Sequence, residues 1–176
     1  MFLDESGFSL TPTVKRTWAP KGHTPQLSHW FKRDKLSAIS ALTVSPQHRH
    51  VGLALRLATN RALNGLDVRA FLQALLHHLR GAVVLLWDRG TIHTRREVHV
   101  YLADHPRVSP YAFPPYAPEL NPAEHIWNQA DGALANGAPQ HVDQLRGRLH
   151  QTIRKLRGSQ RLLWSCIYAS QLPWKR

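Results

Sequence analysis

The stretch FPPYAPELNPAEHIW, residues 113–127, is the part of the sequence around which the rest can be arranged. Its prolines fix φ and remove backbone donors, so residues 113–118 are expected to form a stiff, extended connector. Asn121 can then cap a helix, Pro122 suits the first helical position, and Glu124 would be accurately placed in the first turn. Asn-x-x-Glu is also an ordinary capping box, in which the glutamate bonds back to the amide of the cap.

Composition indicates a compact globular protein with an excess of positive charge. Its 176 residues suit one domain with a real core, and the 43% of hydrophobic residues exclude a disordered chain. Lys and Arg outnumber Asp and Glu by 23 to 11, which favours nucleic acid as a partner ahead of a membrane surface. The longest aliphatic run, residues 82–87, is too short to cross a bilayer. Cys166 is the only cysteine, so we expect no internal disulfide and a reducing compartment.

Hydrophobic periodicity predicts an α/β domain with a mixed β-sheet and helices on its faces. Strands are expected at residues 1–3, 14–18, 36–44, 51–57, 82–87 and 108–113, with the pair 36–44 and 51–57 antiparallel. The run 82–87 does not alternate, so we expect it to be buried on both faces. Helices are expected after a cap at Asp67, after a capping box formed by Thr94 and Glu97, from Asn121, and along two later amphipathic stretches at 142–156 and 162–168.

Two of the expected strands end in an acid. Asp4 follows residues 1–3, Asp88 follows residues 82–87, and the helix start can bring Glu124 to the same edge of the sheet. Carboxylates that meet repel one another, and a divalent cation that prefers oxygen ligands removes this penalty. Two such ions, about 4 Å apart, could activate a nucleophile and stabilise a leaving 3′ oxygen. Glu5 could replace Asp4, but neighbours on a strand face opposite sides, which favours Asp4.

Four segments then resemble the catalytic domain of mariner-like DDE transposases, with the bacterial insertion-sequence branch as the nearest match. They are DESGF at 4–8, TWAPKG at 17–22, WDRGTIH at 87–93 and PPYAPELNPAEHIW at 114–127. The 35 residues between Asp88 and Glu124 are close to the spacing that such enzymes use. The resemblance covers nearly the whole chain, and the proline-rich segment with Leu-Asn-Pro-x-Glu is its most specific part.

The resemblance implies a ribonuclease-H-like fold, with a mixed sheet flanked by helices, as a single catalytic domain over residues 1–176. It implies that Asp4, Asp88 and Glu124 form the catalytic triad and hold two Mg²⁺ (or Mn²⁺) ions. The implied reaction is cleavage at transposon ends, followed by attack of the freed 3′-OH on target DNA. The implied partners are these DNAs and a second copy of the chain in a DNA-bound homodimer. The expected location is the bacterial cytoplasm, at the nucleoid and not at a membrane.

The sequence departs from the family pattern at two places. Arg89 stands where the family commonly has Asn, and its guanidinium could contact DNA phosphate or compete with the cations. We also expect the N-terminal helix-turn-helix region of such transposases to be missing here, and a separate reading frame could encode it. These departures favour an alternative, in which the chain is a truncated, non-catalytic remnant that binds DNA by its charge. A ribonuclease or a junction-resolving enzyme on the same fold is a third interpretation.

Other residues have both a structural and a functional interpretation. His93 matches a family position near the site, and at a strand-to-helix turn it is either a hydrogen-bonded structural residue or an auxiliary of the reaction. Trp18 suits packing, whereas aromatic and basic residues in the early loop could stack on bases and bind phosphate. The candidate DNA-binding residues are Lys15, Arg16, Lys21, Trp30, Lys32, Arg33 and Lys35.

Overall fold

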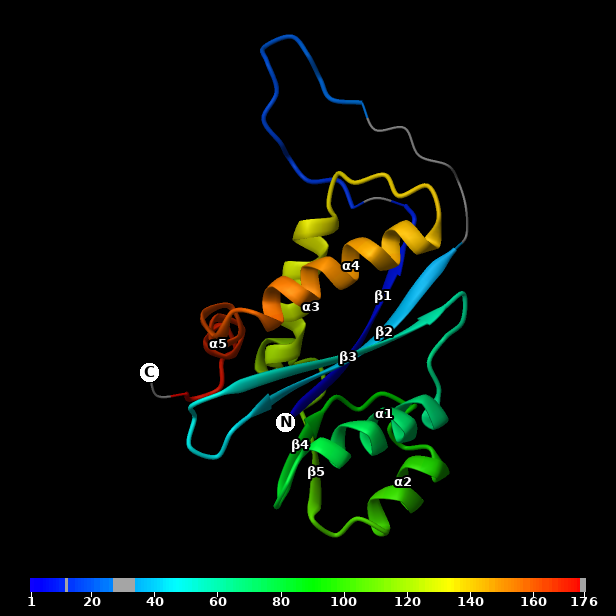
Figure 1. The fold of residues 1–176 in the computed structure, drawn as a ribbon, viewed down its shortest axis with the longest axis vertical. Coiled ribbons are helices and arrows are strands. Elements are labelled where there is room, and N and C mark those ends of the chain that lie inside the picture. Colours follow the sequence, from blue (N-terminus) through cyan, green and yellow to red (C-terminus); the bar gives the residue numbers. More distant parts are fainter. Residues whose placement is uncertain (12, 27–33, 175–176) are drawn as a thin grey trace.

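The computed structural model describes residues 1–11, 13–26 and 34–174. It contains a five-stranded sheet in the order β3-β2-β1-β4-β5 (Figure 1). Two antiparallel pairings join the first three strands, and parallel pairings join β1 to β4 and β4 to β5. The strands are β1 (Phe2–Ser9), β2 (Lys35–Val44), β3 (Val51–Thr59), β4 (Val83–Trp87) and β5 (Val108–Ala112). The predicted mixed sheet and the antiparallel pair are confirmed.

Helices cover both faces of this sheet (Figure 1). One face carries α1 (Gly65–His78) and α2 (Arg96–Ala103), which enclose a core with Leu3, Ile39 and Leu85. The other face carries α3 (Pro122–Leu134), α4 (Val142–Arg157) and α5 (Gln160–Ala169), over a second core that includes Phe2 and Phe8. No helix in the described part of the chain is both long enough and apolar enough to span a membrane.

The alternation of β1 separates its two acidic residues. Phe2 and Phe8 belong to the core under α3–α5, whereas Leu3 belongs to the core under α1 and α2. Because side chains alternate between the faces of a strand, Asp4 lies on the α3 side and Glu5 on the α1 side. This separation decides which of the two carboxylates can approach the helix that carries Glu124.

Two of the strand predictions are wrong. The strand predicted at 1–3 continues to Ser9, because β1 pairs with β2 residue by residue from Phe2 to Ser9, and Asp4 therefore lies inside a strand. Residues 14–18 form no strand, and the backbone amide of Lys15 donates instead to the side chain of Asn136, at 2.9 Å.

The interpretation of 82–87 as a strand buried on both faces is also wrong. Burial alternates along β4, and the Val84 side of the strand is open, with that residue 53% exposed. The sheet is nevertheless parallel here, with β4 between β1 and β5. Leu86, on the same side as Val84, is only partly buried against the core under α3–α5. The opposite side is buried under α1 and α2, with Val83, Leu85 and Trp87.

Two helix caps differ from the prediction. The N-cap of α1 is Asn64, three residues before Asp67, because the Asn64 side chain accepts from the Asp67 amide at 3.2 Å and the Asp67 side chain accepts from the Asn64 amide at 3.0 Å. Arg95, not Thr94, precedes α2, because the Thr94 hydroxyl donates to the Thr91 carbonyl within the preceding turn. The amphipathic stripes of α1, α4 and α5 are buried as predicted.

Candidate active site

The three predicted acids line one cavity of about 380 Å³ at the edge of the sheet. Its remaining walls are Arg89, Gly90, residues 113–118 and Asn121. Phe2 pairs with Leu86 between the parallel strands β1 and β4, so Asp4 and Asp88, each two residues further along, reach the same level of the sheet. The first turn of α3 brings Glu124 to the same cavity. The predicted convergence is therefore present, although Asp4 comes from the middle of its strand.

Asp4 is a buried carboxylate held by an indole. Trp127 Nε1 donates to Asp4 Oδ2 at 2.8 Å, and Trp127 follows Glu124 by one turn of α3. Burial, followed by the charges of Glu124 and Glu5, raises the pKa of Asp4 to about 8. A buried group with nearby like charges is costly to ionise, and an opposite charge close by would relieve this cost.

Asp88 ends β4 in a different environment. Its side chain is 56% exposed, and its Oδ1 accepts from the Gly90 amide at 2.8 Å and lies 3.1 Å from His93 Nδ1. The hydrogen bond from His93 is the main reason why the pKa of Asp88 lies below its ordinary value. A Cβ atom at Gly90 would lie 2.9 Å from Asp88 Oδ1, so this turn needs glycine to keep the carboxylate in place.

Glu124 does not close a capping box. The Asn121 side chain caps α3 by accepting from the Ala123 amide at 3.1 Å, while the Asn121 amide donates to the Pro118 carbonyl at 2.9 Å. The carboxylate of Glu124 is thus left free to face the cavity, and the alternative interpretation as a structural cap is wrong. Burial and the charge of Asp88 raise the pKa of Glu124.

The connector before α3 is not extended throughout. A turn at residues 115–116 puts Tyr116 in the left-handed region, with φ 58°, and a short 3₁₀ helix follows at Pro118–Leu120. The three prolines of this segment still restrict its backbone, and the 3₁₀ helix supplies the carbonyl that bonds the Asn121 amide. The segment therefore forms one wall of the cavity and also fixes the start of α3.

His93 and Glu5 form a pair that sequence reasoning did not identify. His93 Nε2 lies 3.0 and 3.1 Å from the two carboxylate oxygens of Glu5, on the α1 side of the sheet. Burial opposes a charge on His93, but its hydrogen bonds to Asp88 and Glu5 outweigh burial and raise its pKa to about 10. Glu5 is thus bound to His93 and does not line the cavity. The alternation of β1 was the one signal in the sequence that placed Glu5 on this side.

The donor set of the cavity suits a divalent cation that prefers oxygen. Asp4 and Asp88 each use one carboxylate oxygen for the hydrogen bonds described above, which leaves the other oxygen for a ligand. Together with Glu124, they could supply three oxygens from three separate elements. Mg²⁺ typically takes a few carboxylates and completes its shell with water and phosphate oxygens. Arg89 lines the same cavity and is exposed.

The candidate DNA-binding residues are not part of this cavity. Lys15, Arg16 and Lys21 are exposed in the segment 13–26, which extends past the ends of α3 and α4 (Figure 1). Lys35 opens β2 and is also exposed. Trp30, Lys32 and Arg33 lie outside the described residues. A DNA-binding role for all seven stays a prediction.

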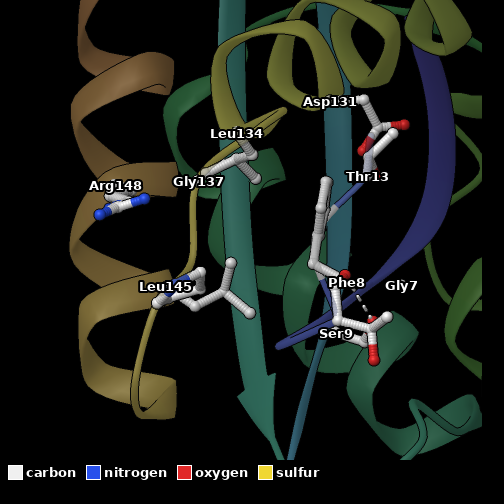
Figure 2. A pocket seen from close by; sticks show the side chains of 11 residues that line it. Gly7, Phe8, Ser9, Thr13, Asp131, Leu134, Gly137, Leu145 and Arg148 are labelled. Atoms are coloured by element: carbon white, nitrogen blue, oxygen red, sulfur yellow. Dashed lines mark hydrogen bonds between the residues drawn. The ribbon is translucent and has the colours of Figure 1, made fainter. Parts of the chain in front are cut away.

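A second hollow, of about 190 Å³, lies between β1 and α4. Figure 2 shows Phe8 and Ser9 of β1 on one side of it and Leu145 and Arg148 of α4 on the other. It contains none of Asp4, Asp88 and Glu124, so it offers no comparable set of metal ligands.

Known proteins share this sequence pattern and this fold. The sequence model of a family described as DDE superfamily endonuclease matches residues 1–146. No curated protein sequence matches the chain.

Crystal structures of the Mos1 transposase share the arrangement of strands and helices. The Mos1 strand transfer complex has a TM-score of 0.67 at 17% identity, and the match covers 94% of this chain and 49% of that chain. The Mos1 mariner paired end complex with Mn has a TM-score of 0.63 at 16% identity, with coverage of 94% and 50%. The catalytic domain of Mos1 mariner transposase has a TM-score of 0.50 at 14% identity, with coverage of 85% and 81%. The chain thus spans about half the length of the chains in the two complexes, and the predicted ribonuclease-H-like fold is confirmed.

Proposed function

Because the chain belongs to the DDE superfamily of endonucleases, we propose that it is the catalytic domain of a transposase that cleaves DNA strands at transposon ends. In this proposal the freed 3′-OH then attacks a phosphodiester of target DNA. The observation that carries the proposal is the meeting of Asp4, Asp88 and Glu124 in one cavity, each from a different element. Two Mg²⁺ or Mn²⁺ ions held there would polarise the phosphate and activate the attacking oxygen.

The surroundings of the three acids serve to orient them. Trp127 fixes Asp4 from the helix side, and Gly90 and His93 fix Asp88 from the strand end. The Asn121 cap fixes the first turn of α3 and with it the backbone of Glu124. Acids held in this way can take up a cation without first reorganising, which is the general advantage of a preorganised site. Arg89, exposed at the same cavity, can contact a phosphate of the bound strand.

DNA and a second copy of the chain are the proposed partners. The formal net charge of +12 supports an extended contact with phosphates, and the Mos1 mariner paired end complex named above contains a chain of similar fold. Lys15, Arg16 and Lys21, which are exposed in the segment 13–26, are the described candidates for contacts with the DNA backbone.

Nicking of supercoiled plasmid in the presence of Mg²⁺ or Mn²⁺ tests this function. We expect Asp88→Asn and Glu124→Gln to lower the nicking rate by at least about a thousandfold, because each removes a charged ligand from the cavity. Asp104→Asn, after α2, and Glu119→Gln, before α3, are matched controls because both acids lie outside the cavity. Undiminished nicking by either cavity variant would exclude the proposed reaction.

Arg89 favours a second candidate, a DNA-binding remnant without catalysis. A guanidinium at the cavity could compete with a divalent cation for the same carboxylates. The discriminating measurement is the melting temperature at millimolar Mg²⁺ or Mn²⁺, since a ligand that binds only the folded chain must raise it. If the chain is an enzyme, its melting temperature should rise clearly with the metal, and Asp88→Asn should remove that rise. If it is a non-catalytic remnant, the melting temperature should not change, although the chain still binds DNA.

A further inference from the structure

The imidazole of His93 lies outside the cavity but touches one of its acids. Its Nδ1 is 3.1 Å from Asp88 Oδ1 and 3.1 Å from the Asp88 carbonyl oxygen, and its side chain is 2% exposed. His93 is not among the residues that line the cavity. It can therefore affect a bound cation or DNA strand only through Asp88.

The position of this ring is fixed by contacts that do not involve the Asp88 carboxylate. Trp87 stacks on it with ring centroids 4.5 Å apart and planes within 5°, which sets the plane of the imidazole. Both oxygens of Glu5 contact Nε2, which sets its rotation within that plane. The backbone amide of His93 donates to the Gly90 carbonyl at 3.0 Å, which closes the turn beneath the ring.

The Asp88 carboxylate, in contrast, is fixed by little else. It is 56% exposed at the end of β4, and apart from His93 its described partner is the amide of Gly90. A carboxylate in such a place would otherwise rotate about its side-chain bonds. The rigid ring therefore sets the orientation of the mobile carboxylate, and not the reverse.

Glu5 completes the arrangement from the far side of the sheet. Both ring nitrogens face oxygen acceptors, an arrangement that favours hydrogen on both nitrogens and therefore a positively charged ring. A buried cation requires a counter-charge, which Glu5 supplies. Glu5, Asp88 and His93 do place ligand atoms within 4.8 Å of one another, the spacing of a metal site. Because both ring nitrogens already bond to carboxylates, this cluster orients Asp88 and does not itself need an ion.

We propose that His93 is a positioning residue, held by Glu5 and Trp87, that turns the free oxygen of Asp88 toward the divalent cation. This inference rests on the proposed function, because it concerns the affinity of the same acids for metal. It assigns a role to Glu5 that is separate from that of Asp4, the acid next to it in the chain.

Two substitutions of His93 separate positioning from simple packing. Asn keeps a donor near the place of Nδ1 and can still bond Asp88, whereas Gln carries its donor farther out, toward Glu5. We expect His93→Gln to weaken Mn²⁺ binding by the full chain about tenfold to a hundredfold, the usual cost of losing a group that orients a ligand. His93→Asn should recover most of the affinity. His99→Gln, at an exposed position of α2, is the matched control and should bind Mn²⁺ like the wild type.

Calorimetric titration with Mn²⁺ alone gives the readout, after thermal unfolding has shown that each variant is folded. A folded His93→Gln variant with wild-type affinity, or Asn and Gln variants that lose affinity equally, would overturn the positioning role. Failure of the proposed function would give another result: Asp88→Asn would then bind Mn²⁺ with the same affinity as the wild type. Glu5→Gln should weaken binding in the same direction as His93→Gln, since Gln keeps only one of the two oxygens that hold Nε2 of the ring.

Discussion

Asp4 and Asp88 lie at the same level of neighbouring parallel strands, but their surroundings shift their pKa values in opposite directions. Asp4 is buried, and burial together with nearby acids raises its pKa to about 8. Asp88 is half exposed, and the hydrogen bond from His93 lowers its pKa. The opposite directions imply that ionised Asp4 lowers the stability of the metal-free fold, whereas ionised Asp88 raises it. A cation site can thus combine one carboxylate whose ionisation is costly with another whose ionised form is stabilised by a hydrogen bond.

The largest expected effect is that of removing the support of Asp4. Trp127→Phe deletes the donor to Asp4 Oδ2 and part of a buried side chain that packs edge-on against Phe8. We expect the free energy of unfolding to fall by about 3 kcal/mol, measured by urea denaturation without metal. Trp164→Phe, at a half-buried position of α5, is the control and should cost less. A loss below about 1 kcal/mol for Trp127→Phe would show that Asp4 does not depend on the indole.

The second effect should have the opposite sign. Asp4→Asn removes a carboxyl that is costly to ionise, so we expect the metal-free variant to be more stable at pH 8 by on the order of 2 kcal/mol. Since the folded pKa is raised, the wild type holds this proton more tightly when folded and loses stability as pH rises from about 4 to about 8. The advantage of the variant should therefore vanish below about pH 4. An advantage that is constant across this range would contradict the raised pKa.

Asp88→Asn should be destabilising, which sharpens the contrast with Asp4. The substitution removes a charged partner of His93, and we expect a loss of about 1 kcal/mol, kept small by solvent screening of a half-exposed group. Because the pKa of Asp88 is lowered in the folded state, this contribution is present above the ordinary pKa of an Asp and is lost as pH falls through the folded value. Thermal unfolding at pH 7 and at pH 3 measures it. A rise in stability at pH 7 would remove the distinction between the two acids.

The smallest change in stability is expected at Gly90. Gly90→Ala puts a Cβ about 2.9 Å from Asp88 Oδ1, so the carboxylate must shift. We expect stability to change by less than about 1 kcal/mol but the nicking rate to fall about tenfold, because the reacting groups are misplaced. Gly147→Ala in α4 meets no neighbouring atom within 4 Å and should leave nicking unchanged. Equal nicking by the two alanine variants would show that the orientation of Asp88 is unimportant.

The convergence of the acids could be predicted from local signals. An apolar run that ends in Asp88 and a cap at Asn121 before Glu124 are both encoded within a few residues, and the structure contains the corresponding strand and helix. The parallel pairing of β1 with β4, which brings Asp4 beside Asp88, joins distant segments and is known only from the structure. The amphipathic stripe of α4 was equally visible, since helical spacing depends on nearby residues.

The remaining features depend on contacts between distant parts of the chain. The length of β1 is set by its pairing with β2, which no pattern within MFLDESGFS reveals. The bond between Glu5 and His93 joins residues 88 positions apart, and the bond between Asp4 and Trp127 joins residues 123 positions apart. Burial of β4 was misjudged because the continuous apolar run does not report which helices cover each face. Such features require the tertiary arrangement.

The most direct test of the central claim is an anomalous-difference map of crystals soaked in Mn²⁺. The account predicts Mn²⁺ in the cavity, bound by carboxylate oxygens of Asp4, Asp88 and Glu124, with Glu5 bonded to His93 and outside the coordination shell. Mn²⁺ found only between Glu5 and His93, or at no position near the three acids, would contradict it.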